Sequence, residues 1–137
     1  MILPHFDIIV QCLDVVKGLP IASWEEQSRP AKRFSGLVGR WAMEKAFTAA
    51  ILARGAAFPK DHSLVSLSHA SGVGLAEAQR VLLAVIDKEV TANELEDTDD
   101  LELYFDCCLL ARGITETVLQ HLTLVSIIKR KPDKENP

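Results

Sequence analysis

Residues 62–106, HSLVSLSHASGVGLAEAQRVLLAVIDKEVTANELEDTDDLELYFD, decide the fold that the sequence predicts. Apolar residues at helical spacing predict a short helix over 62–70 and a longer helix over 75–88, joined by a tight turn at 71–74. Residues 90–94 are strand-like, and residues 101–106 alternate apolar and polar side chains, as a half-buried strand does. The order helix, turn, helix and hairpin predicts a mainly α fold with a small β-hairpin.

The two predicted helices also carry small residues at the points where they would cross. Ser68 and Ala78 would let the helices approach closely, and Gly72 tolerates the positive φ that a tight turn requires. With these residues, the stretch resembles the winged helix-turn-helix family of bacterial regulators, of the IclR- and MarR-like kind. The residues that carry the resemblance are Leu67, Ser68, Gly72, Val73, Ala78 and Val81. The resemblance covers about residues 41–106, and a generic helical hairpin with an acidic loop is the alternative.

The flanking segments are predicted to be helical as well. We expect one helix over residues 6–17, a second from Pro30 to Arg54 that is weakened at Gly36 and Gly39, and a C-terminal helix that is capped by Thr115. The predicted units are an N-terminal helix and linker (1–28), a winged helix-turn-helix domain (29–106), a C-terminal helix (107–131) and a polar tail (132–137).

The family resemblance implies a DNA-binding transcriptional regulator, because the second helix of the motif enters the major groove in this family. Gln79 and Arg80 have side chains that can form paired hydrogen bonds with adenine and guanine, and Ala76 can contact a thymine methyl group. Basic residues at other positions would contact the phosphate backbone of double-stranded DNA. These residues are Lys32, Arg33, Arg40 and Lys60.

The charge of the chain favours a different partner. The net charge is −4, and five acidic residues lie between positions 94 and 100, where the tip of the wing would face phosphate. The alternative is a winged-helix interaction module whose acidic segment 94–102 and apolar helix bind a basic protein partner.

Both terminal helices are strongly apolar, and one small domain cannot easily cover both of them. We therefore expect them to pair in a symmetric homodimer. The predicted dimerisation residues are Phe6, Ile9, Leu13, Val16, Leu119, Leu122, Val125 and Ile128.

A second, weaker resemblance rests on residues 41–46 (WAMEKA), 53–55 (ARG) and 62–64 (HSL), together with Pro59. These segments resemble the HEPN helical domain, which accompanies nucleotidyltransferases and in some members is an RNase. The RNase pattern is an Arg followed by a His after four to six residues. Here seven residues separate Arg54 from His62, and eight separate Arg112 from His121, so this resemblance implies a non-catalytic helical module.

The remaining chemistry of the sequence predicts no enzyme, cofactor or metal site. The four histidines lack the i, i+4 spacing of metal-ligand pairs, and no glycine-rich phosphate loop follows a strand. Cys12, Cys107 and Cys108 are interpreted as buried thiols of a reducing cytosol. No apolar run approaches the ~20 residues that span a membrane. We therefore expect a cytoplasmic protein without membrane association.

Overall fold

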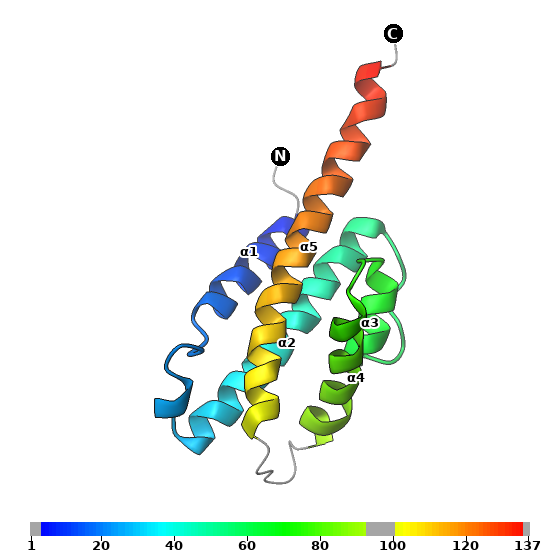
Figure 1. The fold of residues 1–137 in the computed structure, drawn as a ribbon. Helices are drawn as coiled ribbons and strands as arrows, with labels where there is room; N and C mark the ends of the chain where they lie inside the picture. The colour runs from blue at the N-terminus through cyan, green and yellow to red at the C-terminus, as the bar shows by residue number, and fades with distance from the viewer. Residues whose placement is uncertain (1–3, 93–100, 136–137) are drawn as a thin grey trace.

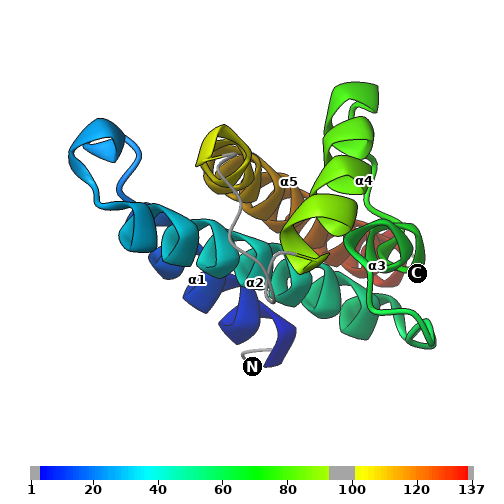
Figure 2. The same cartoon turned by 90° about the horizontal axis from the view of Figure 1, so that it is seen from below.

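The computed structural model describes residues 4–92 and 101–135, and these ranges contain helices and no strand. The helices are α1 (Pro4–Lys17), the 3-10 helix η1 (Trp24–Glu26), α2 (Arg29–Arg54), α3 (Leu64–Ser71), α4 (Glu77–Ala92) and α5 (Leu101–Glu135). The long helices α2 and α5 lie side by side, α1 packs against both of them, and α3 and α4 lie on the other side (Figure 1). Seen from below, α4 stands at the edge of the bundle (Figure 2).

The prediction of a winged helix is wrong, because the described residues on either side of the gap at 93–100 are helical and contain no strand. Residues 101–106 form the first turns of α5. Tyr104, Cys107, Cys108 and Ala111 are completely buried at helical spacing and form one stripe along α5. Residues 90–92 belong to α4, and the rest of the expected hairpin, residues 93–100, lies outside the described part of the chain.

The helix predicted to start near Pro30 and to end at Arg54 is confirmed. Ser28 caps α2, since its hydroxyl accepts a hydrogen bond from the backbone N–H of Ala31 at 3.2 Å. Gly55 ends α2 in the left-handed conformation with φ 72°. Ser63 is the N-cap residue of α3, since its hydroxyl accepts a hydrogen bond from the backbone N–H of Ser66 at 3.1 Å.

The expected weakness of α2 at its two glycines is also wrong, since α2 is continuous through both. A Cβ atom on Gly36 would lie 2.2 Å from Cδ1 of Tyr104, and one on Gly39 would lie 3.3 Å from the carbonyl oxygen of Cys107. The glycines therefore allow α2 to approach α5 closely.

Helix α5 continues through position 115, where the sequence predicts a helix start. Thr115 is buried in the middle of α5, and its hydroxyl donates a hydrogen bond to the carbonyl oxygen of Ala111 at 2.7 Å. The C-terminal part of α5 extends beyond the rest of the bundle (Figure 1). Within the described residues, no helix has the length and apolar character that crossing a membrane requires.

Candidate functional site

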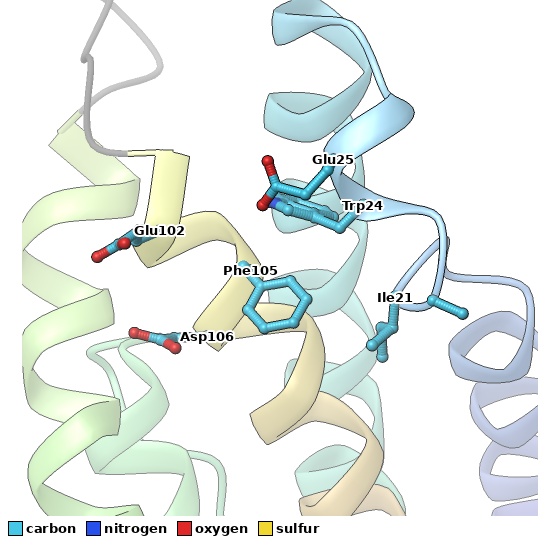
Figure 3. A pocket seen from close by; sticks show the side chains of 7 residues that line it. Ile21, Trp24, Glu25, Glu102, Phe105 and Asp106 are labelled. Atoms are coloured by element: carbon cyan, nitrogen blue, oxygen red, sulfur yellow. The ribbon is translucent and has the colours of Figure 1, made fainter.

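The described surface is hollowed between η1 and the first turns of α5. Seven residues line this cavity of about 470 Å³, which we call the acidic–aromatic pocket. They are Ile21, Ala22, Trp24, Glu25, Glu102, Phe105 and Asp106. In Figure 3, Phe105 lies in the centre, with Glu102 and Asp106 to one side and Trp24, Glu25 and Ile21 to the other.

Trp24 positions one wall of the pocket. Its indole is buried and contacts the ring of Phe105, with the centroids 5.2 Å apart and the planes tilted by 56°. Gln27 closes the turn around Trp24, because its amide donates a hydrogen bond to the hydroxyl of Ser23 at 3.2 Å. The segment that the sequence predicts as a linker is therefore held on α5 by an aromatic pair.

The carboxylates give the pocket its charge. Glu102 and Asp106 are one turn apart on α5, so their like charges are neighbours on the helix surface. Glu25 contributes a third carboxylate, whose side chain is 93% exposed. No Lys, Arg or His lines this pocket. The pocket thus combines negative charge with two aromatic rings.

One cation of the chain already lies against this aromatic wall. The Nζ atom of Lys32 is 6.0 Å from the centroid of the Trp24 ring and 4.0 Å from Oε2 of Glu25. A cation near the face of an indole is attracted by the ring quadrupole. Lys32, which the sequence assigns to DNA contact, therefore packs within the protein with a side chain only 13% exposed.

Arg40 and Gln79, two further predicted DNA contacts, also have partners within the protein. Arg40 forms ion pairs with Glu44 and Asp87. The side-chain oxygen of Gln79 accepts a hydrogen bond from the backbone N–H of Ala76 at 3.0 Å, at the start of α4. These side chains serve local structure in the described protein.

The other predicted DNA contacts differ in exposure. Ala76 and Arg80 at the start of α4 are exposed, as is Lys60 in the loop before α3. Arg33 is half-buried in α2. No hairpin in the described residues accompanies α4, so the groove-binding arrangement of a winged helix is missing from this part of the chain.

Asp87 is the centre of a structural network that sequence analysis missed. Its two carboxylate oxygens accept hydrogen bonds from the backbone N–H groups of Leu64 at 2.7 Å and Val65 at 3.0 Å. Arg40 supplies the balancing charge. Asp87 therefore joins α4 to the N-terminus of α3 and to α2, with its charge placed where the helix dipole favours an anion.

The predicted dimerisation residues divide into three groups by their burial. Ile9, Val16 and Leu122 are buried in the core of the chain itself, so their side chains are already covered. Phe6, Leu13, Leu119 and Val125 are half-buried. Ile128 is 64% exposed, and Leu124 and Ile127 near it on α5 are also exposed.

The described residues contain no cluster of three or more His, Cys, Asp or Glu side chains that could hold a metal ion. The three cysteines are buried free thiols. Burial raises the pKa of Cys12 to about 11 and that of Cys108 to about 12, and it raises the pKa of Cys107 as well. These thiols are poor nucleophiles, since the thiolate is the reactive form.

Comparison with protein-family models, curated proteins and solved structures gives no match for this chain. Sequence analysis did not predict the acidic–aromatic pocket. It placed Glu102, Phe105 and Asp106 on a predicted strand and also included Glu102 in the acidic segment 94–102. The spacing of Glu102 and Asp106 would have placed both on one face of a helix, had residues 101–106 been predicted as helical.

Proposed function

We propose that this chain is a non-catalytic helical binding module that holds a basic segment of a protein partner in the acidic–aromatic pocket. The observation that carries this proposal is that three carboxylates, those of Glu25, Glu102 and Asp106, line the same pocket as the Trp24–Phe105 pair. The resemblance of residues 41–64 to HEPN domains supports a helical module, because those domains are helical and the described residues contain no strand.

The chemistry of the pocket matches a Lys or Arg side chain. Carboxylates form short, charge-assisted hydrogen bonds with ammonium and guanidinium groups. The aromatic rings would cover the aliphatic stem of the same side chain and attract its charge, as Trp24 does with Lys32. A bound cation would also relieve the repulsion between Glu102 and Asp106 on neighbouring turns.

The size of the pocket favours a side chain rather than a large surface. About 470 Å³ lies within the range of small-ligand sites, so one long cationic side chain and part of its neighbour would fit. The lining residues supply carboxylates, aromatic rings and aliphatic carbons, and no hydroxyl, thiol or imidazole. Binding is therefore the activity that this set of groups supports best.

A peptide titration tests the proposal. We expect a fluorescein-labelled peptide of alternating Arg and Leu residues to bind the full chain, measured by fluorescence anisotropy. The variant Glu102→Gln/Asp106→Asn keeps the shape of the pocket and removes two charges, so it should weaken binding about tenfold or more, since each charged hydrogen bond contributes about 1.5–3 kcal/mol.

The control removes the same charge elsewhere on the surface. Glu89→Gln/Glu116→Gln alters two exposed carboxylates on α4 and α5 that do not line the pocket. Equal weakening in both double variants would mean non-specific attraction and would refute the pocket. Salt-sensitive binding of a labelled DNA duplex in place of the peptide would instead favour a nucleic-acid partner.

We also propose that the chain forms a homodimer through the exposed end of α5. Leu124 is 59% exposed, Ile127 is 54% exposed and Ile128 is 64% exposed. They belong to the C-terminal part of α5, and this helix extends past the other helices at its C-terminal end (Figure 1). An apolar helix face of this kind is commonly covered in an assembly.

A further inference from the structure

A second cavity lies where the C-terminal ends of α2 and α3 meet α5. Its volume is about 320 Å³, enough for roughly ten water-sized groups. The lining residues are Ala50, Ala53, Arg54, Ser71, Gly72, His121, Leu122 and Val125. Four of them are aliphatic, and Arg54 and His121 are the only titratable residues among them.

Arg54 is held in a defined place at this cavity. Its Nη1 atom donates a hydrogen bond to the carbonyl oxygen of Ala70 at 3.0 Å. Gly72, at φ 71°, gives the guanidinium room, because a Cβ atom there would lie 2.9 Å from Nη1. The guanidinium of Arg54 carries five N–H donors. Only one of its nitrogen atoms, Nη1, donates a hydrogen bond to the carbonyl oxygen of Ala70 in this contact.

The hydroxyl of Ser71 already has hydrogen-bond partners within the protein. It donates to the carbonyl oxygen of Ser68 at 2.6 Å and accepts from the backbone N–H of Val73 at 3.2 Å. The polar groups that the cavity offers a ligand are therefore the guanidinium of Arg54 and the imidazole of His121, and no carboxylate lines it to neutralise them.

We propose that this cavity binds a small oxyanion with an apolar body, such as an aromatic or aliphatic carboxylate or phosphate ester. The oxyanion would lie between Arg54 and His121, and the body would pack against Leu122, Val125 and the two alanines. This site is separate from the acidic–aromatic pocket, and the proposal does not depend on the function proposed for that pocket.

Binding should be linked to the protonation of His121. Burial, together with the nearby charge of Arg54, lowers the pKa of His121 below its ordinary value. An oxyanion beside the imidazole favours the protonated form, so binding raises this pKa and takes up a proton. Affinity should therefore increase as the pH falls from the pKa of His121 in the complex to its lower pKa in the free protein.

Nuclear magnetic resonance of the histidine side chains tests the site. The chain has four histidines, and the His121→Gln variant identifies the signal of His121. We expect benzoate and phenyl phosphate to shift the His121 signals saturably, with a Kd of about 1 mM or tighter, and to raise the pKa of His121 while the other three histidines keep theirs.

Arg54→Gln should abolish the saturable shift, whereas Arg112→Gln, an exposed position on α5 outside the cavity, should preserve it. Circular dichroism spectra that match the parent protein would show that both variants fold. No saturable shift with either aromatic anion, or the same shift in Arg54→Gln, would overturn the proposal. Inorganic phosphate binding as tightly as phenyl phosphate would overturn the part assigned to the apolar body.

Discussion

At the scale of single residues, Gly36 shows how one missing side chain sets the distance between the two longest helices. In the sequence, Gly36 lowers the expected helix stability by about 1 kcal/mol relative to Ala. In the structure, a Cβ atom at this position would overlap Cβ, Cγ and Cδ1 of Tyr104, which is completely buried. The close contact between α2 and α5 at Gly36 therefore outweighs the low helix propensity of glycine.

We expect Gly36→Ala to destabilise the protein by about 1–3 kcal/mol, because the added methyl group overpacks the α2–α5 contact. Urea unfolding followed by circular dichroism measures the change. Gly113→Ala in α5 is the matched control, since the nearest atom to its new Cβ is Nε2 of Gln79 at an ordinary 3.7 Å. The control should be more stable by up to about 1 kcal/mol. Stabilisation by both substitutions would contradict the close approach at Gly36.

The three thiols give a second prediction at this scale. Cys107 is completely buried, and its Sγ donates a hydrogen bond to the carbonyl oxygen of Gly36 at 3.1 Å. The raised pKa values of the three thiols leave little thiolate at about pH 8. Ellman's reagent should therefore react slowly with the folded protein and rapidly with all three thiols in denaturant. Fast reaction of one thiol before unfolding would place that cysteine at the surface.

At the scale of elements, the sequence predicts α2 well because its signals are local. Ser28, Pro30 and Gly55 mark its ends whatever the rest of the chain does. The error at residues 101–106 has a tertiary cause. Helix α5 contacts α1, α2 and α4, so apolar side chains occupy more than one of its faces and six residues can imitate the alternation of a strand.

The acidic–aromatic pocket could not be predicted from the sequence for a related reason. Trp24 and Phe105 are far apart in the chain, and only the packing of η1 on α5 joins them. Their sequence neighbours show no shared motif. The carboxylates of Glu102 and Asp106 could have been placed together from spacing alone, but only on a segment already known to be helical.

A prediction at the scale of elements concerns Asp87, because this residue connects α2, α3 and α4. Asp87→Ala should cost about 3 kcal/mol, since it leaves the charge of Arg40 without this partner and two N–H groups of α3 without their acceptor. Thermal and urea unfolding measure the loss. Glu89→Ala, an exposed site two residues further along α4, should change stability by less than about 0.5 kcal/mol. Similar costs at the two sites would show that the network contributes nothing specific.

At the scale of the whole molecule, the bundle itself buries part of the apolar surface of the two terminal helices. Ile9 and Val16 of α1 and Leu122 of α5 are covered by the protein's own core, so much of the apolar surface that the sequence assigns to a dimer is buried within one chain. What remains are the exposed apolar side chains in the C-terminal part of α5. This end of the helix extends beyond the rest of the bundle (Figure 1).

Because this apolar surface remains exposed, the oligomeric state of the protein tests the proposed homodimer. We expect size-exclusion chromatography with light scattering to give a dimer at micromolar concentration, and Ile127→Glu/Ile128→Glu to give a monomer, because two charges would enter the apolar contact. Val81→Glu/Val85→Glu is the matched control, since it places the same charges at exposed apolar sites of α4. A monomeric parent protein would exclude the dimer, and loss of the dimer only in the α4 variant would move the interface to α4. If the α5 variant alone is monomeric while its helix content is unchanged, α5 serves both as the centre of the bundle and as its contact with a second copy.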